Sequence, residues 1–344
     1  MKKLKGAVVG CGMISKYHLM GWQRLENVEI KALVSRNTDN AKKRIEFAPG
    51  ATIYSDYLEA LEKEDLDFVD ILTPPHVHAW YCLEAKKRGI HIICQKPITD
   101  NLDDAHTLVN VFEGYDKLFA IHENHRYRPW FTDMQQKLKE GFFGEKHYVH
   151  IQQLNPSEPD VAYKLAMKEG VLLEHGTHLV DMTHALFGTP LRTYARLHHM
   201  SKKLTGENFA HVMFEYPETT VCIDVGWKPG GVQQASFLLT GDEGEAYYQG
   251  SMVRGGDSRY RLMNGKEVVL DEQRNSADDY VESFYLFEKE CTELMLNGNV
   301  HQVTQSGAEN IKSLASTFAA YESAYTSSIM EIKSLEKVNL GILK

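Results

Sequence analysis

The sequence predicts an α/β fold: a doubly wound parallel sheet, followed by an α+β domain with a large, mostly antiparallel open sheet. In the first third of the chain, short apolar runs alternate with amphipathic stretches, a pattern typical of parallel strands covered by helices on both faces. Further on, runs of alternating polarity are separated only by short polar turns, which favours antiparallel strands. We therefore expect two domains, over residues 1–125 and 126–344.

The elements of the first domain are expected in alternation. Strands are predicted at 6–10, 28–34, 67–72, 90–94 and 118–122. Apolar residues at helical spacing predict a helix over 13–25, and a second helix is predicted over 101–115 with Thr99 and Asp100 as candidate caps.

The second domain begins with predicted helices over 130–140 and 171–187, and two long helices, 276–296 and 303–333, close it. Between them, strands are predicted at 192–199, 208–216, 219–227, 234–240 and 245–249. One face of these strands is apolar, with Val212, Phe214, Val221, Ile223 and Val225. This face packs either on the domain's own helices or on another subunit, and both alternatives stay open.

Composition excludes several classes of function. The 344 residues are 43% hydrophobic, enough to bury two ordinary cores. A formal charge of −9 and a pI near 6.0 argue against nucleic-acid binding. No apolar run reaches the roughly eighteen residues of a membrane span. The five cysteines are widely spaced and form no C-x-x-C pair, which is typical of reduced thiols in a cytoplasmic protein.

A glycine-rich turn, Gly10-Cys11-Gly12-Met13-Ile14-Ser15, joins the first predicted strand to the first helix. Its first glycine permits a tight turn, and its second lets the backbone approach a pyrophosphate held at the helix N-terminus. Ser15 replaces the usual third glycine. We expect Gly10, Gly12, Met13 and Ile14 to bind a dinucleotide.

The end of the second strand bears on the choice of dinucleotide. An acid there would bind the ribose of NAD, but the chain has Ser35 and Arg36. Arg36 can pair with a 2′-phosphate, so the expected cofactor is NAD(P) with a slight preference for NADP. The alternative, that Arg36 stacks on the adenine or faces water, is nearly as good.

Two further segments carry side chains suited to redox chemistry. Lys96 follows the strand at 90–94, where open α/β sheets bind ligands, and a partly desolvated lysine can have a lowered pKa. In the helix at 171–187, Glu174 and His178 are four residues apart, and Asp181 follows three residues later. A carboxylate beside an imidazole suits a general base, although the group can equally be structural. Lys164 lies in a polar loop that can fold over such a site.

Together these segments resemble the Gfo/Idh/MocA oxidoreductases, named for glucose-fructose oxidoreductase, inositol 2-dehydrogenase and a rhizopine catabolism protein. The resemblance covers essentially the whole chain. It rests on the G-x-G-x-x-S turn, on T-P-P-x-x-H followed by lysine-proline, and on G-V-L-L-E-H-G-T-H-L-V-D. It implies a Rossmann domain, an open-sheet domain that supplies substrate contacts, a homo-oligomer (dimer or tetramer), and NAD(P)-dependent chemistry on sugars, cyclitols or related polyols.

The resemblance also implies roles for single residues. Lys96 and His178 match the catalytic lysine and histidine, and Glu174 stands where an aspartate is usual. Residues matching the cofactor-lining segment are Thr73, Pro74 and His78, and those matching the crossover into the substrate domain are Asn124, Arg126 and Pro129; we expect Asn124, Arg126, Glu174 and His178 to bind substrate.

Gln95 departs from the family pattern, in which a glutamate precedes the lysine. The exchange removes a negative charge near Lys96, while hydrogen bonding can continue through the amide.

The expected reaction is hydride transfer between nicotinamide and a carbinol, with His178 as base and Lys96 stabilising the alkoxide. One alternative is a redox-neutral glycosidase of the same fold, and a weaker one is a non-catalytic dinucleotide or sugar sensor. The histidines at 122–125 and 174–178 have metal-type spacing, but with 16 histidines in the chain we expect no metal. The expected partner is a small sugar or polyol, with no nucleic acid and no membrane.

Overall fold

The computed structural model describes residues 3–227, 231, 234–250, 257–262, 267–269 and 279–332. By packing, the chain divides into two compact units. The first comprises Met1–Lys137, Tyr248–Tyr260 and Val268–Ile311; the second comprises Leu138–Tyr247, Arg261–Glu267 and Lys312–Lys344. The first unit thus takes up a stretch from the C-terminal half, and the domain boundary between residues 125 and 126 stays a prediction.

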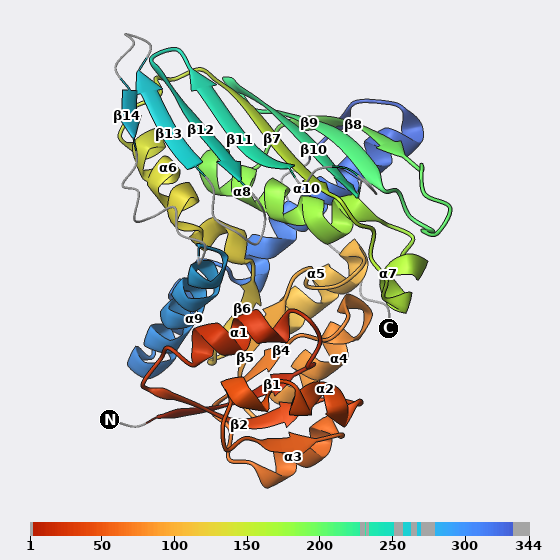
Figure 1. Cartoon of the computed structure of the whole chain (residues 1–344), viewed down its shortest axis with the longest axis vertical. Coiled ribbons are helices and arrows are strands. Elements are labelled where there is room, and N and C mark those ends of the chain that lie inside the picture. Colours follow the sequence, from red (N-terminus) through yellow and green to blue (C-terminus); the bar gives the residue numbers. More distant parts are fainter. Residues whose placement is uncertain are drawn as a thin grey trace. The chain divides into compact units, whose positions relative to one another are not determined.

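The first unit contains a six-stranded, wholly parallel sheet (Figure 1). Its strands are β1 (Leu4–Val9), β2 (Val28–Val34), β3 (Thr52–Tyr54), β4 (Phe68–Ile71), β5 (His91–Gln95) and β6 (Phe119–His122), in the order β3-β2-β1-β4-β5-β6. The sheet is built outward from β1 in one direction and from β4 in the other. The doubly wound fold is confirmed, and the short edge strand β3 is an addition to the prediction.

Helices alternate with these strands. They are α1 (Ser15–Trp22), α2 (Thr38–Lys42), α3 (Tyr57–Lys63), α4 (Pro75–Lys86) and α5 (Leu102–Val111), followed by α6 (Pro129–Lys139), with short 3₁₀ turns η1 (Ile45–Phe47), η2 (Asn124–Tyr127) and η5 (Val300–Gln302). The cap of α5 is neither Thr99 nor Asp100 but Asn101, whose side chain accepts a hydrogen bond from the Asp104 amide at 2.9 Å.

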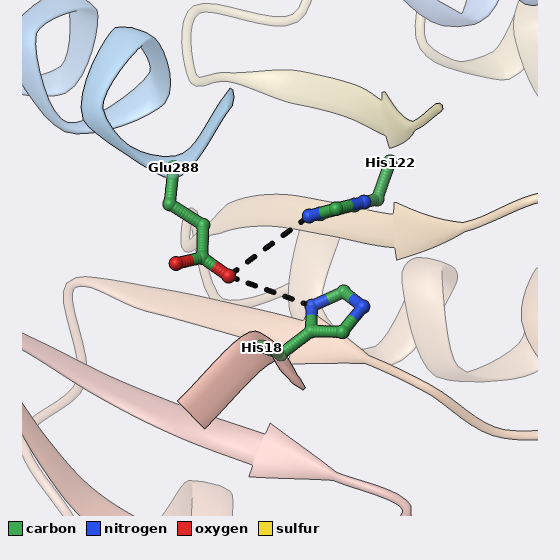
Figure 2. Close-up of side chains that lie close together, drawn as sticks. All are labelled: His18, His122 and Glu288. Atoms are coloured by element: carbon green, nitrogen blue, oxygen red, sulfur yellow. Dashed lines mark ion pairs between the residues drawn. The ribbon is translucent and has the colours of Figure 1, made fainter. Parts of the chain in front are cut away.

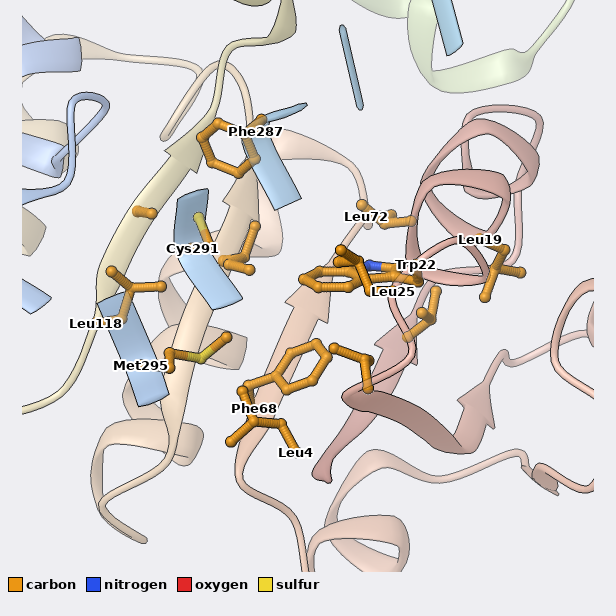
Figure 3. Close-up of a cluster of buried hydrophobic side chains, with 14 of the residues drawn as sticks. Leu4, Leu19, Trp22, Leu25, Phe68, Leu72, Leu118, Phe287, Cys291 and Met295 are labelled. Atoms are coloured by element: carbon orange, nitrogen blue, oxygen red, sulfur yellow. The ribbon is translucent and has the colours of Figure 1, made fainter. Parts of the chain in front are cut away.

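A helix from late in the sequence completes the core of the first unit. This helix, α9 (Asp279–Asn297), lies beside α1, and Figure 3 shows Phe287, Cys291 and Met295 among the apolar side chains of the sheet and α1. Trp22 and Phe68 anchor the cluster, with ring centroids 4.7 Å apart. Residues 276–278 of the predicted helix lie outside the described residues.

The second sheet has nine strands in the order β14-β13-β12-β11-β7-β10-β9-β8-β15. They are β7 (His147–Asn155), β8 (Arg192–His198), β9 (Phe209–Glu215), β10 (Thr219–Trp227), β11 (Gln234–Gly241), β12 (Gly244–Gly250), β13 (Asp257–Leu262), β14 (Glu267–Val269) and β15 (Met330–Glu331). Among the registered pairs, only β7 and β10 run parallel, which confirms a mostly antiparallel sheet.

Its remaining helical segments are α7 (Ala162–Ala166), a π-helical turn η3 (Leu172–Gly176), α8 (Thr177–Phe187) and α10 (Gly307–Thr326). Figure 1 shows α8 and α10 along one face of the sheet. The predicted helix at 303–333 was too long, because Met330 and Glu331 pair with β8; residue 333 lies outside the described residues.

The apolar face of the second sheet is buried within this chain. Its five predicted members, Val212, Phe214, Val221, Ile223 and Val225, are all fully enclosed. Hydrogen bonds tie the same layer together, from the Tyr216 hydroxyl to Thr183 of α8 at 3.0 Å and from the Ala195 amide to Ser323 of α10 at 3.1 Å. Of the two alternatives left open by the sequence, the chain's own helices cover this face. Among the described residues, no helix combines the length and apolar character needed to cross a membrane.

Candidate functional site

The carboxyl ends of the parallel strands form the candidate cofactor site of the first unit. Because the strands are parallel, the segments that follow β1, β2, β4 and β5 lie at one edge of the sheet. The strand order reverses between β1 and β4, and open α/β sheets bind ligands at such a point. The glycine turn follows β1, and Thr73 follows β4 closely.

The glycine turn has the backbone that a phosphate site needs. Gly10 has φ +103°, and a Cβ there would lie 2.7 Å from the Leu72 carbonyl oxygen, so only glycine fits. A Cβ at Gly12 would meet no atom of the chain within 4 Å. Its main chain is therefore open to a ligand. Ser15 is buried and donates to the Gly12 carbonyl at 2.6 Å, which fixes the turn in place of the third glycine.

Sequence reasoning missed Arg44 at this turn. Its guanidinium donates to Ser15 Oγ and to the Gly12 carbonyl, both at 3.0 Å. Met13 is 78% exposed, and the first turn of α1 contains no acidic residue. A positively charged side chain beside the N-terminus of a helix whose first turn has no acidic residue favours the binding of an anion.

The segment after β2 is polar and open. Ser35 donates from its hydroxyl to the Asn37 carbonyl at 2.8 Å, so this hydroxyl is engaged within the chain. Arg36 is exposed, as binding a cofactor phosphate requires. No acid occupies the first two positions after β2.

His78 connects the segment after β4 to the segment that contains Lys96. This imidazole is fully buried, with its Nε2 2.6 Å from the Thr73 carbonyl and its Nδ1 3.0 Å from the Pro97 carbonyl. Burial lowers the pKa of His78 to about 4, against the opposing effect of these carbonyls. His78 thus joins the Thr73 turn to the Lys96–Pro97 bond, which is cis, and its place in the cofactor-lining segment stays a prediction.

Lys96 is the first residue after β5 and is partly buried. Its backbone amide donates to the side-chain oxygen of Gln95 at 2.8 Å. The amide nitrogen of the same Gln95 lies 2.9 Å from His18 Nε2. The glutamine that departs from the family pattern therefore links the main chain of Lys96 to α1.

The link continues into a fully buried polar group. His18 Nδ1 lies 2.9 Å from Asp70 Oδ2, and the Trp22 indole donates to the same oxygen at 2.8 Å. His18 and Asp70 are both completely enclosed. An aspartate in the middle of the apolar strand β4 is thus stabilised by two donors from one helix.

Glu288 of α9 points toward His18 and His122, as Figure 2 shows. Its Oε1 lies 3.8 Å from His18 Nδ1 and 3.9 Å from His122 Nε2, and all three residues are fully buried. Burial and the charge of Asp70 raise the pKa of Glu288 well above its usual range. Two histidines and a carboxylate are also metal-ligand types, with donor atoms within 4.8 Å of one another. The same His18 nitrogen, however, lies within hydrogen-bond distance of Asp70.

The crossover residues have structural partners in the first unit. Asn124 is buried and donates to Ser283 Oγ at 2.8 Å, and Arg126 lies 3.5 Å from the Glu309 carboxylate. Arg128 forms a buried ion pair with Asp279. The structure therefore engages the side chains of Asn124 and Arg126 in packing against later helices, and their substrate role stays a prediction.

In the second unit, Glu174 lies within the π-helical turn η3, one turn before α8. The predicted regular helix at 171–187 is therefore interrupted, and π turns occur often at functional sites. Glu174 forms an ion pair with Lys164 of α7. Burial alone would lower the pKa of Lys164, but the charge of Glu174 raises it above its usual value. Lys164, which the sequence predicted to lie in a loop able to fold over the site, is thus held by Glu174.

His178 lies in the first turn of α8 and is 7% exposed. Asp181 is fully buried, and its Oδ1 accepts a hydrogen bond from Ser313 of α10 at 2.9 Å. His175 packs its ring against Trp227 with centroids 5.7 Å apart. His178 and Glu174 therefore come from adjoining turns of one segment that the sheet supports.

Comparisons with known proteins match both units. A family model described as the oxidoreductase family with an NAD-binding Rossmann fold matches residues 4–123, and one for the GFO/IDH/MocA C-terminal domain matches residues 131–247.

Two curated relatives match almost throughout. The chain is 27% identical to a D-apiose dehydrogenase of Paraburkholderia graminis, over 98% of this chain and 92% of that protein. It is 25% identical to a D-apiose dehydrogenase of Rhizobium rhizogenes, over 97% of this chain and 99% of that protein.

A solved oxidoreductase of Agrobacterium radiobacter, in complex with NAD+, L-tartaric acid and magnesium, superposes with a TM-score of 0.83. Its sequence is 23% identical, and the match covers 96% of this chain and 99% of that one. This likeness shows the shared fold.

Proposed function

Because this chain belongs to the Gfo/Idh/MocA family of oxidoreductases, we propose that it is an NAD(P)-dependent dehydrogenase of a sugar, cyclitol or related polyol. The reaction transfers a hydride between nicotinamide and a carbinol carbon. The observation that carries the proposal is the glycine turn after β1 together with Lys96 after β5, at one edge of one parallel sheet. Two nearly full-length relatives named D-apiose dehydrogenase support a sugar substrate.

The residues present fit a dinucleotide. The open main chain at Gly12 and the positive φ of Gly10 support a pyrophosphate site, with Met13 and Ile14 at the start of α1. We propose that Thr73 and Pro74 line the nicotinamide side.

Arg36 is proposed to bind a 2′-phosphate. A charge-assisted bond of this kind is worth about 1.5–3 kcal/mol, so Arg36→Ala is expected to weaken NADPH binding roughly 10- to 100-fold and to leave NADH binding unchanged. Fluorescence titration of both reduced cofactors measures this. Equal weakening of both would remove the NADP preference.

The proposed catalytic residues are Lys96 and His178. Bound nicotinamide supplies the hydride acceptor. His178 takes the proton of the substrate hydroxyl, and the ammonium of Lys96 stabilises the negative charge that develops on that oxygen. Glu174, fixed by its ion pair with Lys164, orients the substrate.

The test is a panel of sugars, sugar acids and polyols, each assayed with both cofactors by absorbance of the reduced nicotinamide. On the best substrate, Lys96→Met and His178→Ala are expected to lower kcat about 100- to 10,000-fold, with cofactor affinity retained. Exposed residues of the same types, changed in Lys87→Met and His301→Ala, are matched controls. Turnover that survives both active-site changes would remove the assignment.

We also propose that the chain works as a homo-oligomer in the cytoplasm. All five cysteines are free and four are buried, which agrees with a reducing compartment. Light scattering on the eluting protein measures the assembly, and a monomer at working concentration would contradict it.

A further inference from the structure

We infer that Gln95 is a positioning residue. Its side-chain oxygen anchors the main chain of Lys96, and its amide NH₂ donates to His18, which is a neutral imidazole protonated on Nδ1. The functional half of this inference rests on the proposed function of Lys96. The structural half stands on hydrogen bonds of the first unit alone.

The direction of each hydrogen bond follows from the one before it. The Lys96 amide can only donate, so the Gln95 atom that it contacts, at 2.8 Å, is the side-chain oxygen. The other end of the amide is then NH₂, a donor, and it faces His18 Nε2 at 2.9 Å. His18 Nε2 must therefore be the unprotonated, accepting nitrogen.

The remaining proton of His18 is consequently on Nδ1. That nitrogen donates to Asp70 Oδ2 at 2.9 Å, which also accepts from Trp22. The chain of bonds thus runs from Asp70 on β4, through α1, to the first residue after β5. Every group in it has a defined donor or acceptor role.

The charges that surround His18 agree with a neutral ring. The groups facing it are Asp70 on β4, Gln95 on β5, His122 on β6 and Glu288 on α9, with the ring of His122 at 4.1 Å between centroids. The pKa of Glu288 is raised, and the carboxyl that lies within hydrogen-bond distance of His18 Nδ1 and the Trp22 indole is that of Asp70. Glutamine, unlike glutamate, satisfies the chain without a second proton on His18.

Gln95→Glu tests this logic because glutamate has the same shape but no donor. Its carboxylate still accepts from the Lys96 amide, but it faces the lone pair of His18 Nε2 unless one more proton is taken up. In the variant, Asp70 and the introduced carboxylate lie on opposite sides of the ring, and together they favour a doubly protonated His18. In Gln95→Glu the series of hydrogen bonds is therefore complete at low pH, and it is broken as rising pH removes that second proton from His18.

The first measurement is a long-range ¹H–¹⁵N histidine spectrum of the protein without cofactor, with His18 assigned from its absence in His18→Asn. In the wild type we expect Nδ1 protonated and Nε2 bare, and in Gln95→Glu at low pH we expect both nitrogens protonated. Protonation on Nε2 alone, or a metal bound by His18 and His122, would overturn the inference.

The second measurement is hydrogen exchange at the Lys96 amide. Gln95→Leu keeps the side-chain size, removes the acceptor, and is expected to speed exchange at least tenfold at this amide while β1 exchanges as before. Unchanged exchange would refute the anchor.

Kinetics then separate the two proposals. As pH rises from 6 to 9, the kcat of Gln95→Glu divided by that of wild type is expected to fall about tenfold, with KM for the cofactor unchanged. The effect is on kcat because displacement of a catalytic group acts on the chemical step. The exposed Gln23→Glu on the same unit controls for added charge. If Gln95→Glu has the same pH dependence of kcat as wild type and the same histidine spectrum, the positioning role is refuted. If the protein oxidises no polyol but shows the expected His18 tautomer and Lys96 amide exchange, only the proposed function is refuted.

Discussion

Each unit of this protein holds an aspartate between two nitrogen donors, but the surroundings of the two differ. Asp70 accepts from His18 and Trp22, and all three side chains are enclosed. Asp224, on the second sheet, lies 2.8 Å from His150 Nε2 and 2.5 Å from His211 Nδ1, and these histidine side chains are 33% and 46% exposed.

The difference teaches that donor–acceptor chemistry alone does not set the importance of such a group. In water, each lost bond is replaced by a bond to solvent, and exposed ion pairs contribute little to stability. In the interior nothing replaces it, and the remaining partner keeps the full cost of its desolvation. The enclosed group also connects to the main chain of Lys96, whereas the group on the second sheet joins neighbouring strands.

The largest expected effect is the loss of Asp70. Asp70→Ala leaves two buried donors without an acceptor, and at about 1–3 kcal/mol for each we expect the free energy of unfolding to fall by about 2–6 kcal/mol. Urea denaturation by linear extrapolation measures it. Asp70→Asn, which keeps the shape and one oxygen, should cost less and remains measurable if the alanine variant does not fold. A cost below about 1 kcal/mol for both would erase the contrast with Asp224.

Glu288 sharpens the comparison through its pH dependence. Its folded pKa is raised, so the native state binds more protons than the unfolded state above the unfolded carboxyl pKa of about 4.3, and stability is lost as pH rises from there toward the folded pKa. Glu288→Gln removes this proton dependence. The variant should match wild type near pH 4 and exceed it by roughly 1–3 kcal/mol at pH 8.

The opposite result would be equally informative. A less stable Glu288→Gln at pH 8 would mean that the carboxylate is ionised and paired with a protonated His18 or His122, and the enclosed group would then be an ion-pair network. Thermal unfolding at both pH values, with the exposed Glu243→Gln as a control, distinguishes the two.

Local sequence patterns predicted the parts of the site whose geometry is local. The glycine turn and Lys96 follow their strands where expected, because the end of a parallel strand fixes its own edge of the sheet. The interruption of the helix at 171–187 was missed, since a π turn leaves the apolar spacing almost unchanged. β7 was missed because His147, Gln152 and Gln153 obscure the alternation of its buried residues.

The buried polar group could not be found by pattern, because its members are distant in sequence. His18 and Asp70 are 52 residues apart, and Glu288 comes from α9, which follows β14 of the second sheet in the sequence. One signal was present: an aspartate inside the apolar run F-V-D-I must have buried donors, since an unpaired charge there is too costly. The sequence therefore shows that Asp70 needs buried hydrogen-bond donors, but only the structure shows which residues supply them.

The smallest expected effect is at Asp224, and it completes the contrast. Burial alone would raise the pKa of this carboxyl, but hydrogen bonds from His211 and His150 lower it below its usual value. Its stabilisation is therefore present above the unfolded pKa and is lost as pH falls through the folded one. Asp224→Asn should cost no more than about 1 kcal/mol at pH 7, and less in 0.5 M salt, because partly exposed pairs are screened. Measured beside Asp70→Asn under the same conditions, a cost at Asp224 equal to that at Asp70 would show that enclosure does not separate the two groups.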